Sequence, residues 1–253
     1  MKRVLLLLAA VLLSSNFIVA QLNQKGGVPF GLTNPEVFEG IEKPNVFPNK
    51  TPDEFLAEDI KSQGEVGVPM RIGVSVPLGV NVISDENYVQ LDGKTHIWRY
   101  AVKASHAKAL SLVFQSLDLP QNAKLYVYSL DGEYILGYFD EESNSYGKPF
   151  VSQFIPADEI VVEVQYLAKD KSSFGSKLII SEVAYAYRNV YGSKDVGSSD
   201  ACQVNIACPE GDDWRKEQRG VARILFREGS SWYYCTGSLI NNTLQDGTSY
   251  FLT

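Results

Sequence analysis

The sequence contains few of the residues on which hydrolytic chemistry most often depends. It has two histidines in 253 residues, His96 and His106. A Ser-His-Asp mechanism needs an imidazole to accept the serine proton and a carboxylate to orient that imidazole. Neither histidine lies beside a serine in a Gly-x-Ser-x-Gly turn. We therefore expect both to have structural or surface roles, and we predict no catalytic residue within this chain.

Cysteine is also scarce, and its three copies lie in the last quarter of the chain, at Cys202, Cys208 and Cys235. An exported protein can form disulfides, but an odd number leaves at least one thiol without a partner inside the chain. One pair within this set, or a metal ion bound by all three, are the alternatives. No histidine lies nearby and the spacings match no zinc pattern, which argues against a metal. We predict no metal and no cofactor.

Basic clusters are absent as well. The chain has 23 Lys and Arg residues against 30 Asp and Glu, a formal net charge of −7. Binding to phosphate needs a basic face, so this composition excludes nucleic acid as a partner. With 45% apolar and 21% charged residues, the chain has the composition of a soluble globular protein.

No apolar run is long enough to span a membrane. Two basic residues precede the longest run, residues 4–13, and a small residue follows at Ala20. We predict a signal peptide over residues 1–20, cleaved between Ala20 and Gln21. The run is shorter than the roughly 20 residues of a membrane span, which argues against the alternative of a membrane anchor. The protein is therefore expected to be secreted, with no membrane attachment after the signal peptide is removed. We also expect a monomer.

Residues 21–69 are rich in Gly, Pro and Asn and show no sustained periodicity. This pattern predicts a lead-in segment that lies over another part of the protein. One helix is predicted within it, because Thr51 can cap, Pro52 suits the first helical position, and Glu54 completes a capping box. We expect that helix to be short and to end near Gly64.

Residues 70–190 contain short apolar or alternating runs, broken by turn residues at intervals of roughly 8 to 12 residues. The predicted strands are 71–83, 95–103, 109–115, 124–130, 134–139, 159–167 and 177–187. Seven strands rich in Tyr, Val and Phe favour an all-β fold, a β-sandwich large enough to fold by itself. Alternation puts Trp98, Tyr100 and Val102 on one packed face, and we expect the other face to stay partly wet.

The composition of the chain changes after residue 190. Residues 191–200 are small and polar with no apolar period, which predicts a linker open to proteolysis. Beyond it, the runs 221–226, 232–240 and 249–252 predict three antiparallel strands. We interpret residues 201–253 as the opening strands of an incomplete barrel.

An acidic run and a set of aromatic residues are two further candidate binding sites, and each also has a simpler explanation. The acidic run Asp140-Glu141-Glu142 is a candidate for calcium, but it lacks the Asp-x-Asp-x-Asp-Gly spacing, and a solvated turn explains it as well. Exposed aromatics on strands can stack on sugars, although aromatics at strand spacing are more often core. The candidates are Trp98, Tyr100, Tyr126, Tyr128, Tyr134, Tyr138 and Tyr146. They leave open an alternative function, a non-catalytic exported β-sandwich module that binds carbohydrate or a protein partner.

The last residues carry a resemblance to a known family. Its motifs are Cys202, Cys208-Pro209-Glu210-Gly211-Asp212, Cys235-Thr236-Gly237-Ser238 and Tyr250-Phe251-Leu252-Thr253. Together they resemble the start of the catalytic domain of bacterial lysyl endopeptidases, which are trypsin-like serine endopeptidases with a chymotrypsin-like double β-barrel. The resemblance implies cleavage of proteins or peptides after lysine, by a Ser-His-Asp triad that lies beyond this chain. It also implies that the three cysteines pair with cysteines further along.

The earlier region carries a weaker resemblance. Trp98-Arg99, Leu119-Pro120 with 123–128, and 180–185 resemble the prodomain that precedes such catalytic domains. The implied order is signal peptide, prodomain over 70–190, processing linker over 191–200, and a truncated protease domain over 201–253. The implied partner of the prodomain is its own catalytic domain.

Three expectations follow from this interpretation. Lysine specificity suggests self-processing between Lys194 and Asp195. As an N-terminal fragment of the precursor, the chain itself should be inactive. Its residues beyond the linker should be unstable or disordered, because an open barrel leaves strand edges unpaired.

Overall fold

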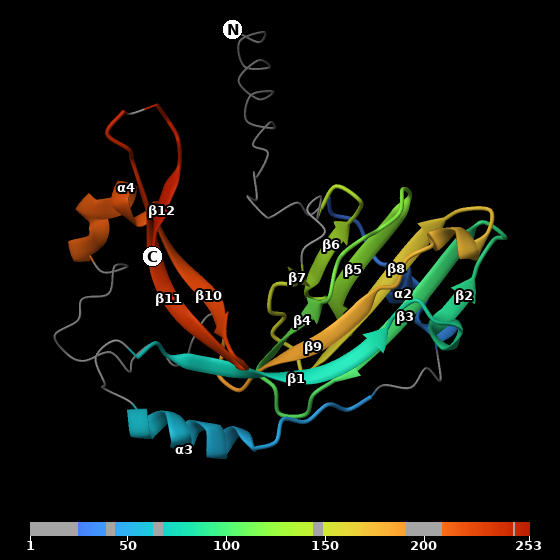
Figure 1. Ribbon diagram of the computed structural model, residues 1–253, viewed down its shortest axis with the longest axis horizontal. Helices are drawn as coiled ribbons and strands as arrows, with labels where there is room; N and C mark the ends of the chain where they lie inside the picture. Colours follow the sequence, from blue (N-terminus) through green and yellow to red (C-terminus); the bar gives the residue numbers. More distant parts are fainter. Residues whose placement is uncertain (1–24, 39–43, 63–67, 144–148, 191–208, 245) are drawn as a thin grey trace, which may run out of the picture.

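The structure, a computed structural model, describes residues 25–38, 44–62, 68–143, 149–190, 209–244 and 246–253. These residues are mostly β-strands joined by short helices, so the class is all-β, as predicted (Figure 1). None of the described helices is long and apolar enough to cross a membrane. The predicted signal peptide with Ala20 and Gln21, and the predicted linker with Lys194 and Asp195, lie outside the described residues.

The described strands form two antiparallel sheets. The seven-stranded sheet has the order β10-β11-β1-β9-β4-β7, with β12 paired to β11, and the five-stranded sheet has the order β2-β3-β8-β5-β6. The first sheet contains β1 (Arg71–Asn81), β4 (Ala109–Phe114), β7 (Phe150–Val151), β9 (Ile179–Ala186), β10 (Val221–Glu228), β11 (Ser231–Ile240) and β12 (Tyr250–Leu252). The second contains β2 (Tyr88–Gln90), β3 (Thr95–Lys103), β5 (Ala123–Ser129), β6 (Ile135–Phe139) and β8 (Glu159–Leu167).

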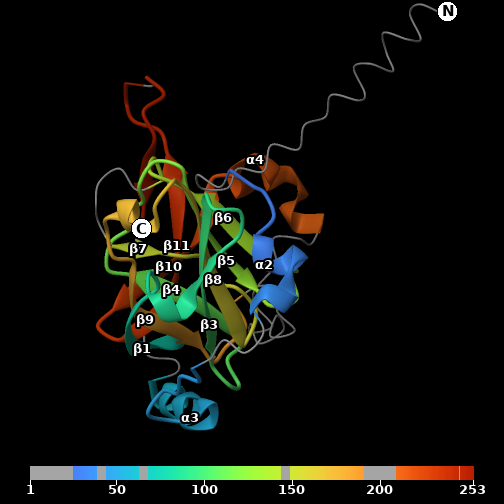
Figure 2. The same ribbon diagram turned by 90° about the vertical axis from the view of Figure 1, so that its right-hand side faces the viewer.

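The helices are short and lie at the ends and on the outer surface of the sheets (Figure 2). Only one of those described exceeds two turns, α3, which lies at one end of the molecule. The helical segments are α2 (Phe30–Thr33), η1 (Pro35–Phe38), α3 (Pro52–Ser62), η2 (Asp85–Asn87), η3 (Lys171–Phe174), η4 (Pro209–Trp214) and α4 (Arg215–Gln218).

The inner faces of the two sheets share one hydrophobic core. Tyr100 and Val102 of β3 and Val164 of β8 belong to the same buried cluster as Leu112 of β4 and Val183 of β9. These residues alternate along their strands, as the period-2 pattern predicts. Burial of this shared apolar face is the main stabilisation of the two-sheet arrangement.

The outer face of the five-stranded sheet is covered by the lead-in segment. Tyr126, Tyr128 and Val161 form a second buried cluster, against which Leu32 of α2 packs. The backbone of Gly26 pairs with Gly137 and Tyr138 of β6. The prediction that the lead-in lies over another part of the protein is therefore confirmed. The prediction that this sheet face stays partly wet holds away from its centre, where Lys124 is exposed and Gln165 is half-buried, whereas Tyr126, Tyr128 and Val161 are buried beneath the segment 25–38.

A buried carboxylate holds the segment in place. Glu163 of β8 accepts hydrogen bonds from the backbone N–H groups of Phe30 (2.7 Å) and Gly31 (2.9 Å) and from the Tyr128 hydroxyl (2.8 Å). The Arg99 guanidinium donates to the same hydroxyl and lies over the ring of Phe38. Burial, together with the neighbouring Glu163 carboxylate, raises the pKa of Tyr128 above its ordinary value. A buried charge costs stability unless it is paired, and this network supplies the partners.

Helix α3 forms as the capping signature predicts. The Thr51 N–H donates to Glu54 Oε2 at 2.8 Å and the Glu54 N–H donates to Thr51 Oγ1 at 3.3 Å. The Phe55 ring stacks on Tyr187 with 5.1 Å between centroids, and Arg71 of β1 donates to Asp59 at 2.8 Å. These contacts fix α3 beside the start of β1.

The titratable groups beneath α3 are shifted by the same contacts. Burial and the hydrogen bond to Asp59 raise the pKa of Tyr187. Hydrogen bonds from Lys50 and Arg71 lower the pKa of Glu58. The carboxylates of α3 are thus used to attach the helix to the sheet.

The predicted strands are present, and two more were not predicted. β3 and β8 have the predicted bounds, and the other predicted strands differ by a few residues at their ends. The unpredicted strands, β2 and β7, are three and two residues long, too short to show alternation. The three runs beyond the linker form β10, β11 and β12.

We expected the chain beyond the linker to be unstable or disordered; the expectation of disorder is wrong for residues 209–244 and 246–253, whereas that of low stability stays a prediction. These residues form η4, α4 and three paired strands, and β11 continues the sheet from the edge strand β1 (Figure 1). The expectation assumed that the edge of β11 has no hydrogen-bonding partner, whereas β1 pairs with part of that edge.

Gly31 is placed where a side chain has no room. A Cβ atom there would lie 2.6 Å from Glu163 Oε2 and 2.8 Å from Tyr128 Oη. We predict that Gly31→Ala lowers the free energy of unfolding by about 1–3 kcal/mol through overpacking, measured by urea denaturation. The exposed neighbour Glu36, changed to Ala, is the control and should shift it by less than about 0.5 kcal/mol. An equal effect of both changes would contradict the role given to Glu163.

Candidate functional site

The junction between β1 and β11 is the place where the predicted prodomain meets the predicted protease segment. The two strands pair antiparallel, with Gly73 opposite Trp232 and Val74 opposite Ser231. The Ser75 N–H donates to the Ser230 carbonyl at 2.7 Å. Residues some 160 positions apart in sequence therefore pair in one ladder, which shifts register between Arg71 and Gly73.

The hairpin that enters this junction is built by a tight turn. β10 and β11 pair along their whole length, from Val221 opposite Ser238 to Glu228 opposite Ser231. Gly229 in the turn has φ 58°, a left-handed conformation that glycine adopts without strain. The resulting register places Leu225, Trp232 and Tyr234 on the same face of the hairpin. This face contributes to a buried cluster with residues of β1, β4 and β9.

Trp232 is the main anchor of the hairpin. It is 5% exposed and belongs to a buried cluster with Ile72 of β1, Ala109 of β4 and Ala184 of β9. Phe154 meets its ring edge to face, with 5.7 Å between centroids. We call the residues around this indole the Trp232 socket: Ile72, Ala109, Val113, Phe154, Ala184, Ala186 and Val190.

Hydrogen bonds and one ion pair join the hairpin to the residues next to the Trp232 socket. The indole Nε1–H donates to Ser75 Oγ at 3.0 Å, so the polar atom of Trp232 has a partner. The Val190 carbonyl accepts from Arg223 Nη2 at 2.6 Å and from the Tyr234 hydroxyl at 2.7 Å. The half-exposed pair of Arg227 and Glu182, at 3.0 Å, adds little stability but matches charge across the junction.

The edge of β1 that accepts β11 is limited in length. Pro77 lies farther along the same strand, at an exposed position, and has no N–H to donate. Proline within sheets is confined to edge strands and bulges. The contact with β11 begins at Met70, whose carbonyl accepts from the Tyr234 N–H at 3.0 Å, and it ends at about Ser75.

One comparison with known proteins bears on the same segment. Residues 196–253 match the family model of the lysyl endopeptidase C-terminal domain. The match covers under a quarter of the chain and includes η4, α4 and β10–β12. This stretch is therefore similar to part of that domain, and the β1–β11 junction joins its described strands to the rest of the chain.

The predicted disulfide residues are only partly described. Cys235 lies on β11 opposite Ile224, with an exposed thiol that forms no disulfide with a described residue. Cys202 and Cys208 lie outside the described residues, as do Lys194 and Asp195. The pairing of all three cysteines remains a prediction.

The two histidines do not form a hydrolytic site. His96 is 2% exposed; its Nε2 faces the Ala168 carbonyl at 3.2 Å and its Nδ1 faces the Tyr88 hydroxyl at 2.7 Å. A carbonyl only accepts, so in the neutral ring Nε2 carries the proton and Nδ1 accepts from Tyr88. Both ring nitrogens are therefore used within the fold.

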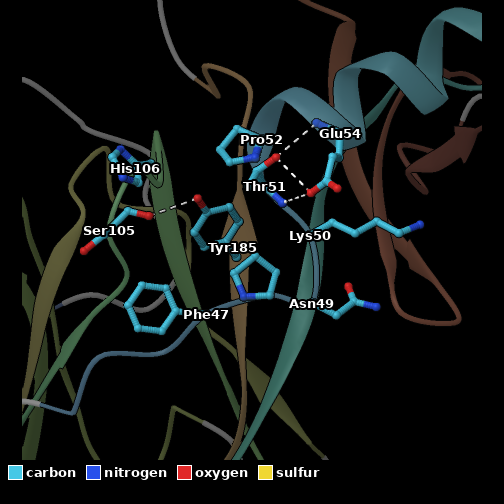
Figure 3. Close-up of a pocket in the computed structure, with 10 residues that line it drawn as sticks. Phe47, Asn49, Lys50, Thr51, Pro52, Glu54, Ser105, His106 and Tyr185 are labelled. Carbon is cyan, nitrogen blue, oxygen red and sulfur yellow. Dashed lines mark hydrogen bonds between the residues drawn. The ribbon is translucent and has the colours of Figure 1, made fainter.

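His106 lines the small pocket drawn in Figure 3. The pocket lies between the start of α3 and the turn at Ser105, and it encloses about 220 Å³, below the roughly 300–1,000 Å³ of common ligand pockets. Two of its polar groups have partners: the Tyr185 hydroxyl donates to the Ser105 carbonyl at 3.1 Å, and Glu54 accepts from Thr51. No hydrogen bond joins the His106 ring to the described serine or carboxylate that line this pocket, so the pocket contains no catalytic triad.

The other candidate sites have structural explanations. Asp140 and Glu142 pair with Lys25, and no group of three or more metal-ligating side chains occurs among the described residues. Of the aromatic candidates, Trp98, Tyr100, Tyr126 and Tyr128 are buried. Tyr134 is exposed, Tyr138 packs against Tyr126, and Tyr146 is outside the described residues. The buried aromatics cannot form a sugar-stacking surface.

Trp232 and the junction were missed by the sequence analysis. The alternation of Trp232 and Tyr234 indicates a buried face on this strand, but alternation does not identify the partner. The exposed Pro77 is a usable signal, because it marks this part of β1 as a sheet edge or a bulge.

Replacing Trp232 tests whether the socket holds the hairpin. We predict that Trp232→Ala weakens hairpin docking by about 3–5 kcal/mol, the usual cost of truncating a buried aromatic. The faster amide hydrogen exchange should be confined to β10, β11 and the start of β1, while the inner core stays protected. Trp214→Ala is the matched control, because Trp214 lies in the same segment and is 59% exposed. Loss of protection throughout both sheets would contradict a local anchoring role.

Proposed function

We propose that this chain carries the N-terminal parts of the precursor of a secreted serine endopeptidase. In this proposal residues 1–20 are a signal peptide, residues 70–190 a β-sandwich prodomain and residues 191–200 a processing linker. Residues 201–253 are the first strands of a trypsin-like double barrel. The observation that carries the proposal is the match of residues 196–253 to the lysyl endopeptidase C-terminal domain.

The proposed chemistry is hydrolysis of peptide bonds after lysine. A serine attacks the scissile carbonyl, a histidine takes the serine proton, and an aspartate orients that histidine. The triad residues belong to a segment that follows residue 253, and no residue of the present chain is assigned to them. His96 and His106 take no part in this proposal, since both ring nitrogens of His96 are used within the fold and no hydrogen bond joins His106 to a serine or carboxylate among the described residues of its pocket.

The cysteines fit the same proposal. Cys202, Cys208 and Cys235 each pair with a cysteine of the following segment, the third close to the catalytic histidine. An exposed thiol at Cys235 leaves that side of β11 accessible to such a partner. No cofactor is required for this chemistry.

The prodomain has a physical role in this proposal. A barrel whose strands pair across long stretches of sequence folds slowly and exposes its edges meanwhile. Pairing of β1 with β11, and burial of Trp232, keep the first strands of the barrel ordered before the later ones are in place. The partner of the prodomain is then its own catalytic domain.

The test is the protein encoded by the full reading frame. We expect that frame to continue after Thr253 with Ala-x-His-Cys and later with a serine in a Gly-Asp-Ser-Gly-Gly-like turn. The purified product should cleave a lysyl peptide substrate and react with a serine-directed phosphonate. A frame without these residues, together with retention of the chain on an insoluble glycan, would reject the endopeptidase and favour the carbohydrate-binding alternative.

Self-processing gives a second test of specificity. We predict that Lys194→Ala in the full-length precursor blocks maturation at the bond to Asp195, because a lysine-specific site has no side chain to bind there. Lys194→Arg is the control: it keeps the positive charge and removes the lysine side chain, so it separates recognition of charge from recognition of lysine. Intact mass spectrometry locates the N-terminus of the mature chain. Maturation at an unchanged position in the Ala variant would rule out self-cleavage after lysine.

A further inference from the structure

We propose that the outer face of the five-stranded sheet is a peptide-recognition groove, which the lead-in segment of a second copy of this chain fits. The chain's own lead-in, residues 25–38, is then a ligand that the protein carries in cis. We call the residues that contact it the lead-in groove: Arg99, Tyr126, Tyr128, Tyr138, Asp140 and Glu163. All of them lie before the predicted linker, so the inference goes beyond the proposed function and does not rest on it.

The groove binds the backbone of the segment at two places. Along the outer edge of β6, the Gly26 N–H donates to the Gly137 carbonyl at 3.1 Å and the Tyr138 N–H donates to the Gly26 carbonyl at 3.1 Å. On β8, the Glu163 carboxylate accepts from two successive backbone N–H groups of the segment. Addition of a chain to a sheet edge is a recurring mode of peptide recognition. None of these contacts requires that the segment be covalently joined to the sheet it binds.

Close packing makes the groove selective for glycine at two positions of its ligand. Gly27 has φ 100°, which glycine adopts without strain, and a Cβ atom there would lie 2.8 Å from Tyr126 Oη. A Cβ atom at Gly31 would lie 2.6 Å from Glu163 Oε2. The next residue, Leu32, packs against the outer buried cluster. The groove therefore selects a chain with two glycines four residues apart and a leucine after the second.

The segment is separable from the inner core. None of residues 25–38, all of which the structure describes, belongs to the buried cluster that the two sheets share. Phe38 is buried at the outer face instead, where the Arg99 guanidinium carbon lies 4.9 Å from its ring centroid. Displacement of the segment therefore leaves the inner core in place and opens the groove.

A second copy is the occupant that the contacts favour. Lys25 pairs with Asp140 and Glu142, so an acidic entrance meets a lysine at the start of the ligand. The lysine, the two glycines and the leucine occur together in the lead-in of every copy. Exchange of an identical segment between copies repeats the same contacts in trans and is a low-cost route to dimers. Because attachment in cis gives the chain's own segment an effective concentration of about millimolar, we expect exchange where that segment is displaced.

The experiment uses two complementary variants of the present chain. The Gly27→Val, Gly31→Val chain keeps the groove and loses the ligand, and the Glu163→Ala chain keeps the ligand and loses the groove. We expect each alone to be a monomer in gel filtration with light scattering, and an equimolar mixture at micromolar concentration to contain a heterodimer. A chain with all three changes is the matched control and should dimerise with neither. A reductant is present throughout, because the Cys235 thiol is exposed.

A peptide titration measures the same recognition directly. A labelled peptide of residues 25–38 should bind the Gly27→Val, Gly31→Val chain and not the chain with all three changes. Gly31→Ala in the peptide should raise the dissociation constant by about 10-fold or more through overpacking. Val28→Ala in the peptide is the control and should leave it nearly unchanged, since Val28 is 61% exposed.

Hydrogen exchange of β3 and β8 checks that each variant keeps the inner core. If the Glu163→Ala chain does not keep it, the titration on the glycine variant decides alone. A mixture that stays monomeric, together with no saturable binding of the native peptide, would overturn the proposal. Equal association of the chain with all three changes would overturn it as well, because that chain has neither ligand nor groove. Neither result depends on whether the full reading frame encodes a triad.

Discussion

The architecture depends on one shared sheet edge. β1 pairs with β9 on one side and with β11 on the other, so it belongs both to the two-sheet core and to the sheet formed with the C-terminal hairpin. Without this pairing, β10–β12 would form a small isolated sheet, and such sheets are rarely stable in water. The backbone ladder fixes direction and register, and Trp232 adds the apolar burial that makes the register selective.

Buried and half-buried charges attach the peripheral segments to this core. Glu163 binds the lead-in through two backbone N–H groups, and the carboxylates of α3 bind Arg71 on β1. In both places a charged group is paired with donors at close range, which offsets its desolvation. In the lead-in and in α3 these directional contacts add to apolar ones, such as Leu32 on the outer cluster and Phe55 on Tyr187.

Much of the local structure was predictable, whereas the junction was not. The alternation in β3 and β8 fixed their bounds, and Thr51 with Glu54 fixed the start of α3. These signals are local, since they depend on residues within a few positions of each other. The pairing of Gly73 with Trp232 depends on two distant edges and on the absence of competing strands, which no local pattern encodes. The role of Glu163 was hidden for the same reason: its backbone donors, Phe30 and Gly31, lie more than 130 positions away.

Pro77 gives the sheet edge a further property. A regular strand of the length of β1 offers a row of free donors and acceptors to any passing chain, which is the usual route to fibrils and intermolecular sheets. Here the donor at position 77 is missing, and the ladder to β9 also shifts register between Pro77 and Val80. The edge is thus open to a strand at one end and closed at the other. A single residue allows β1 to accept one intended strand while discouraging the protein from polymerising through it.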